Sequence, residues 1–61
     1  MIVKVARCNG LFRLEMPNGM RESISNPEND WWDRDAAIRA KDVIAPNYDV
    51  DRSKIRFVHI N

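Results

Sequence analysis

Two side chains of this sequence could form a nucleophile and base pair: the single cysteine, Cys8, and the single histidine, His59. An imidazole that accepts the thiol proton would suit covalent catalysis. The two residues could come close if the first and last predicted strands are parallel neighbours. A single Cys is more often a small buried hydrophobic residue, and a single His in a terminal strand is usually a polar surface residue. We therefore predict no catalytic residue and expect that the protein is not an enzyme.

A cluster of carboxylates, Asp30, Asp33 and Asp35, could suit a hard cation. These residues also lie where a predicted helix begins, and acids at that position commonly serve as caps or favourable partners of the helix dipole. Cys8 and His59 are too few to supply the four ligands of a structural zinc site. We predict no metal site and no cofactor.

The two glycines, Gly10 and Gly19, each follow an Asn in a turn signal, and neither opens a helix. A phosphate-binding loop needs glycines at the start of a helix. No small-molecule substrate is therefore expected.

An apolar pair on the outer side of the predicted helix indicates a contact surface. On a helix that begins at Trp31, Trp31 and Ile38 lie about 20° apart around the axis. Exposed apolar side chains rimmed by charge are typical of contact sites. Alternatively, residues 26–30 cover Trp31, or the helix begins only at Asp33 and Trp31 packs inward. The candidate protein-interaction residues are Trp31, Ile38, Arg34 and Lys41.

The predicted sheet offers a second, basic surface on the side away from the helix. A basic sheet can lie along a nucleic-acid backbone. Strong single-strand binders also present aromatic side chains for base stacking, and this face has none. The alternative is a solvated sheet face on which Glu15 balances part of the charge. The candidate nucleic-acid-binding residues are Lys4, Arg13, Lys54 and Arg56, interspersed with Ile2, Ala6, Val58 and Ile60.

The strands that form this sheet can be predicted from local pattern. Residues 2–8 are rich in β-branched side chains and lead into Asn-Gly at 9–10, a dipeptide that favours a type I′ turn. Residues 11–16 alternate apolar and charged side chains, which predicts a hairpin. A second turn at 17–19 contains Pro and Gly. Residues 20–25 could form a short third strand, and their charged side chains would suit a sheet edge; whether they do is left open by the sequence.

One helix is predicted after a polar segment that breaks the third strand. Pro46 is expected to end it, because proline lacks the N–H that continues a helix. The predicted cap is Asp30 or Asp33, the first residue Trp31 or Arg34, and the last residue Ala45. Positions at 100° intervals place one stripe against the sheet: Trp32, Ala36, Ala37, Ala40, Val43 and Ile44.

A loop at 47–53, anchored by Tyr48 and Val50, leads to a last strand at 54–60. The helix returns the chain so that this strand runs parallel to the first and lies beside it. The sequence therefore predicts an α+β fold of order β-β-(β)-α-β: a three- to four-stranded sheet with one helix packed on one face and the last strand beside the first.

Composition limits the class of protein. A chain of 61 residues is short enough that we expect one domain, residues 1–61, with a thin core. No apolar run approaches membrane-spanning length and no signal-peptide pattern opens the chain, so we expect a cytoplasmic protein. The net charge is +1, but residues 26–51 carry seven acidic and three basic side chains, whereas both ends are basic.

The sequence predicts a small non-catalytic protein-protein interaction module of accessory, regulatory or inhibitor type, in the size range of small proteins encoded by phages and mobile elements. The expected partner is another protein or a second copy of the chain. The alternative is a nucleic-acid-binding module that uses the basic sheet face. No membrane partner is expected.

Overall fold

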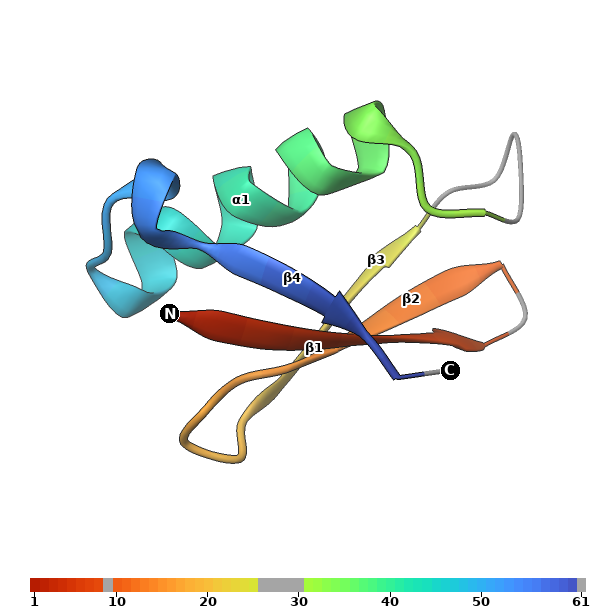
Figure 1. The fold of residues 1–61 in the computed structure, drawn as a ribbon, viewed down its shortest axis with the longest axis horizontal. Coiled ribbons are helices and arrows are strands. Elements are labelled where there is room, and N and C mark those ends of the chain that lie inside the picture. The colour runs from red at the N-terminus through yellow and green to blue at the C-terminus, as the bar shows by residue number, and fades with distance from the viewer. Residues whose placement is uncertain (9, 26–30, 61) are drawn as a thin grey trace.

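A computed structural model describes residues 1–8, 10–25 and 31–60. Four strands form one sheet in the order β3-β2-β1-β4, and the helix lies on one side of it (Figure 1). The predicted α+β fold, with the last strand beside the first, is confirmed. The elements are β1 (Ile2–Cys8), β2 (Leu11–Glu15), β3 (Arg21–Ser25), α1 (Arg34–Tyr48), the 3-10 helix η1 (Arg52–Lys54) and β4 (Arg56–His59). We call the side covered by α1 the helix face and the other side the open face.

The predicted hairpin joins β1 and β2. The two strands are antiparallel and Cys8 pairs with Leu11, which leaves a two-residue connection. Gly10 has a φ of +79°, the left-handed conformation for which glycine has no steric penalty. Asn9, the other residue of the predicted turn, lies outside the described residues.

The second predicted turn joins β2 and β3. The Met16 carbonyl accepts the N–H of Gly19 at 2.9 Å, and the Asn18 side chain accepts the N–H of Met20 at 3.0 Å. Gly19 has a φ of +87°, as the turn signal predicts. β3 is a true third strand, and it lies at the sheet edge, as its charged side chains predicted.

β4 runs parallel to β1, and Val3 pairs with Phe57. The strand begins two residues later than expected, because Lys54 belongs to η1. Asp51 caps this turn by accepting hydrogen bonds from the Ser53 N–H and hydroxyl, both at 2.9 Å. The hydrogen bond from the Ser53 N–H lowers the pKa of the Asp51 carboxyl most, and the bond from the Ser53 hydroxyl lowers it further. Because Asp51 caps it, the segment Arg52–Lys54 forms a 3-10 helix instead of the start of the last strand.

The helix begins at Arg34, one of the two predicted starts. The Asp33 carboxylate accepts the N–H of Ala36 at 2.8 Å and is the N-cap. Asp30, the alternative cap, lies outside the described residues. The start at Arg34 leaves Trp31 ahead of the helix.

The predicted end of the helix at Ala45 is wrong, since α1 continues through Pro46 to Tyr48. Pro46 removes one N–H from the helix ladder, but packing around Tyr48 sustains the last turn. Tyr48 packs against the core, and its hydroxyl donates to the Glu22 carboxylate of β3 at 3.4 Å. Burial raises the pKa of Tyr48, and the charge of Glu22 acts in the same direction. Tertiary contact thus outweighs the local proline signal.

Asp49, the C-cap residue after Tyr48, has a φ of +52° and donates its N–H to the Ala45 carbonyl. An L-residue with a side chain is strained in this conformation, and glycine is not. Asp49→Gly should therefore stabilise the protein by about 1 kcal/mol in urea unfolding. Asp49→Ala, which keeps the Cβ atom, should give no gain. A gain in both variants would show that the Asp49 carboxylate, rather than the backbone, is unfavourable here.

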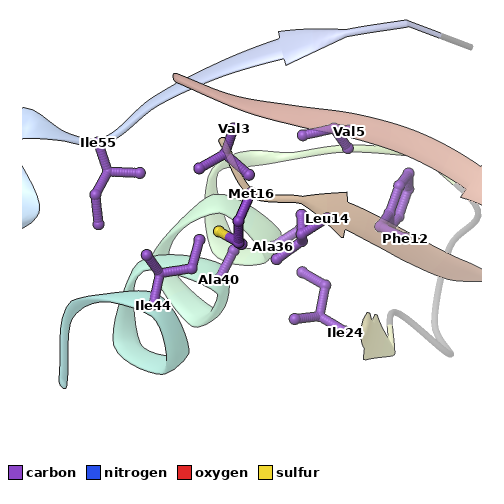
Figure 2. Close-up of a cluster of buried hydrophobic side chains, with 10 residues drawn as sticks. All are labelled: Val3, Val5, Phe12, Leu14, Met16, Ile24, Ala36, Ala40, Ile44 and Ile55. Carbon is purple, nitrogen blue, oxygen red and sulfur yellow. The ribbon is translucent and has the colours of Figure 1, made fainter. Parts of the chain in front are cut away.

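The core lies between the helix face and α1 (Figure 2). Ala36 and Ala40 are fully buried, so the small side chains in the middle of the predicted stripe allow the helix to approach the sheet closely. Their sheet partners are the alternate residues of β1, β2 and β3, as the alternation predicted. The buried cluster comprises Val3, Val5, Phe12, Leu14, Met16, Ile24, Ala36, Ala40, Ile44 and Ile55. Within the described residues, no helix is both long and apolar enough to cross a membrane.

Candidate functional site

The open face is assembled from alternate residues of all four strands. Directly opposed residues on neighbouring strands point to the same side of a sheet. Lys4 pairs with Glu15, and Glu15 pairs with Arg21, so these three side chains form one row across the sheet. The open face consists of Ile2, Lys4, Ala6, Cys8, Leu11, Arg13, Glu15, Arg21, Ser23, Ser25, Arg56, Val58 and Ile60.

Each strand contributes one cation to the open face. Three of these, Lys4, Arg13 and Arg56, belong to the predicted basic surface, and the structure brings them together. The fourth predicted cation, Lys54, lies in η1 outside the sheet. Arg21 of β3 completes the set and was not selected from sequence, although its alternation with Glu22 and Ile24 could have indicated its side.

Among the described residues, Glu15 is the only acidic side chain on the open face. Its carboxylate lies 3.5 Å from the Arg13 Nε atom, and it stands between Lys4 and Arg21 in the register. Glu15 thus forms an ion pair with Arg13, and its single negative charge stands among three cations. Together with Arg56, this leaves the open face with a net positive charge.

Most of the exposed apolar side chains of the open face lie along β1 and β4, beside Lys4 and Arg56. Ile2, Val58 and Ile60 are exposed there, and Leu11 is exposed near the hairpin turn; each has between 43% and 54% of its surface accessible. These are four of the seven large apolar side chains that the described residues expose. Ala6 lies between them and is only 3% exposed, because it is small and its neighbours cover it. Apolar and cationic side chains therefore share one uncovered surface.

A shallow hollow of about 340 Å³ lies at one corner of the open face, where β1 begins and the turn between β2 and β3 folds beside it. Figure 1 shows this turn on the side of β1 opposite α1. No sequence signal predicted the hollow, because it depends on how the turn sits relative to the start of β1. Its lining residues are Ile2, Lys4, Glu15, Met16, Pro17, Gly19 and Arg21.

Three of the four predicted protein-interaction residues lie together on α1, and the fourth, Trp31, does not lie on the helix. Arg34, Ile38 and Lys41 follow one another at helical spacings on one stripe of α1. Trp31 lies three residues before the helix, so its seven-residue spacing from Ile38 does not place it on that stripe. Its side chain is nevertheless 61% exposed, so it has not packed inward.

Trp32 packs over the helix face of the sheet. Its ring makes edge-to-face contacts with Phe12, Phe57 and His59, at centroid distances of 5.2, 5.0 and 5.5 Å. His59 therefore points to the helix face, whereas Cys8 points to the open face. The structure does not bring this pair of residues together as a nucleophile and base.

The carboxylate cluster is divided by the start of the helix. Asp33 is the N-cap, and Asp35 is exposed in the first turn. Asp30 lies outside the described residues. Within residues 1–8, 10–25 and 31–60, no three or more His, Cys, Asp or Glu side chains are grouped so that they could hold a metal ion.

No protein-family model, curated protein or solved structure matches this chain. The function must therefore be argued from the surfaces themselves. They offer an uncovered sheet that is both cationic and apolar, and a helix stripe with one exposed isoleucine.

Proposed function

We propose that this protein is a non-catalytic interaction module that binds another protein through the open face of its sheet. The observation that supports the proposal is the concentration of exposed aliphatic side chains on a face that no described element covers. Exposed apolar surface rimmed by charge is typical of protein contact sites. The cations around it favour a partner whose surface is acidic.

A second copy of the chain is a poor match for the open face. Two open faces packed together would oppose one net positive surface to another, and unpaired like charges are costly at an interface. An acidic partner of different sequence would pair with Lys4, Arg21 and Arg56 while covering the aliphatic residues. A second candidate contact surface for a protein partner lies on α1. It consists of Arg34, Ile38 and Lys41, with Trp31 just before the helix.

Nucleic-acid binding is the alternative function, and the placement of one cation on each strand favours it. Neighbouring strands are about 4.8 Å apart, so these cations form a band across the sheet that could follow a phosphate backbone. The open face carries no aromatic side chain on which a base could stack. The apolar residues beside the cations therefore fit a protein better than a single strand.

The proposed surface can be tested by affinity capture from an extract of the native host. Val58→Asp with Ile60→Asp places two acids among the exposed aliphatic side chains of the open face and should reduce capture of the partner at least tenfold, or about 1.4 kcal/mol. Ile38→Asp is the matched control on α1 and should retain capture. Circular dichroism should show that all variants are folded. Loss with Ile38→Asp and retention with the double variant would place the contact on the helix instead.

Salt dependence separates the two functional classes. Binding of a fluorescent single-stranded oligonucleotide through the open-face cations should weaken steeply as salt rises, because bound phosphates release counterions. Capture of an acidic protein should also weaken as salt screens Lys4, Arg21 and Arg56, but less steeply, because the contacts of Val58 and Ile60 do not depend on charge. If no oligonucleotide binds at low salt, where nonspecific binding is strongest, the nucleic-acid alternative is excluded.

A further inference from the structure

The hollow at the corner of the open face is bordered by two cations from different strands. Lys4 of β1 and Arg21 of β3 stand on either side of Glu15 of β2 in one row of the register. At strand spacings of about 4.8 Å, their backbones are about 10 Å apart. Both side chains are long enough to reach a single anion placed between them.

Neither of these cations has an anionic partner in the part of the chain that the structure describes. The nearby acid, Glu15, is in contact with Arg13, which does not line the hollow. Arg13 therefore neutralises part of the Glu15 charge from outside the hollow. The hollow keeps a positive potential that would favour an incoming negative group.

Glu15 also lines the hollow, and the other lining residues, Ile2, Met16, Pro17 and Gly19, carry no polar side chain. Ile2 is exposed at one side, and Met16 and Pro17 form the side made by the turn. A volume of about 340 Å³ is at the small end of the range for ligand pockets, so it suits a side chain and its neighbours. The fitting ligand is an anion carried on an aliphatic stem.

We infer that this hollow binds an Asp or Glu side chain of the protein partner, held between Lys4 and Arg21 with its stem against Ile2 and Pro17. The inference rests on the proposed function, because it supplies the acidic contact of a partner that also covers Val58 and Ile60. A carboxylate forms charge-assisted hydrogen bonds with both kinds of cation. The aliphatic walls favour such a side chain over a nucleotide, whose phosphate lies next to a polar sugar.

The test is an NMR titration of the ¹⁵N-labelled protein with a soluble, end-blocked peptide in which Glu alternates with Val. At millimolar peptide, the amide signals of Lys4, Gly19 and Arg21 should shift. The same peptide with Gln in place of Glu should leave them nearly unchanged. Equal shifts with both peptides, or no shift with either, would overturn carboxylate recognition.

Paired variants locate the site. Lys4→Gln with Arg21→Gln should weaken binding of the Glu peptide at least tenfold, because both cations are lost. Arg39→Gln with Arg52→Gln removes the same charge from exposed positions on α1 and η1, outside both candidate surfaces, and should change the affinity less than twofold. Equal weakening in the two double variants would mean that the peptide responds to net charge alone, which contradicts the proposed site. Oligothymidylate that shifts the same amides and displaces the peptide would contradict it in favour of phosphate.

The two proposals fail in different ways. If the peptide shifts Val58 and Ile60 and tolerates loss of Lys4 and Arg21, the hollow is not the carboxylate site, but the open face still binds. If peptide binding requires Lys4 and Arg21 while host-protein capture survives the acidic substitutions at Val58 and Ile60, the hollow is supported as a carboxylate site. The proposed function is then contradicted.

Discussion

Replacing Leu14 with Ala should cost about 2–5 kcal/mol of unfolding free energy, enough to leave much of the protein unfolded at room temperature. Leu14 is fully buried at the centre of the core, between the sheet and the alanine stripe of α1 (Figure 2). Truncation leaves a cavity that the sheet cannot easily close. A domain of this size rarely holds more than about 3–5 kcal/mol in total, so one such cavity removes most of it. Urea unfolding followed by circular dichroism measures the loss.

Leu11 provides the matched control, because it lies on the same strand and undergoes the same chemical change. Its side chain points to the open face and is 45% exposed, so Leu11→Ala should cost less than about 1 kcal/mol. Comparable losses in the two variants would mean that Leu11 is also covered, and a larger loss from Leu11→Ala would mean that the two faces of β2 are assigned the wrong way round.

The contrast between Leu11 and Leu14 shows why the sheet could be predicted from the sequence. Strand side chains alternate between faces, so one assignment of β2 determines which residues of the paired strands share the core. The Asn-Gly signal in the sequence then predicted that β1 and β2 pair as a hairpin. The helix supplied the only apolar stripe that could cover the sheet, and this is the arrangement that the structure has.

The errors occur where tertiary contact outweighs a local signal. Pro46 is a strong helix terminator in isolation, but the packing of Tyr48 carries α1 beyond it. Lys54 fits the alternation of a strand, but the cap formed by Asp51 draws it into η1. Both residues lie at the end of an element, where one or two hydrogen bonds decide the conformation.

The candidate site was less predictable than the fold, for a geometrical reason. Alternation could place Lys4 and Arg13 on the open face, but it could not show that the turn at 17–19 folds beside the start of β1 to form a hollow. Trp31 shows the same limit, because its relation to Ile38 depended on where the helix begins. A start at Arg34 takes Trp31 off the helical stripe.

Truncation of the two adjacent tryptophans should destabilise the protein to very different extents. Trp32→Ala should destabilise the protein by about 3 kcal/mol, at the lower end of the range for large aromatic residues because the side chain is half-buried. It removes three edge-to-face ring contacts, with Phe12, Phe57 and His59, each worth about 0.5–1.5 kcal/mol beyond buried area. Urea unfolding gives the energy, and the His59 ring protons should lose the shift caused by the indole.

Trp31→Ala is the control for the same change one residue earlier. Because most of the Trp31 surface is exposed, this variant should lose less than about 1 kcal/mol and keep the His59 ring shift. Its remaining tryptophan should fluoresce at shorter wavelength than the tryptophan left in Trp32→Ala, since Trp32 lies among rings and Trp31 largely in water. A larger loss from Trp31→Ala than from Trp32→Ala would contradict this assignment, because it would make Trp31 the residue that joins the start of α1 to the sheet. In that case the contacts of Trp32 with β2 and β4 would be consequences of the fold rather than a source of its stability.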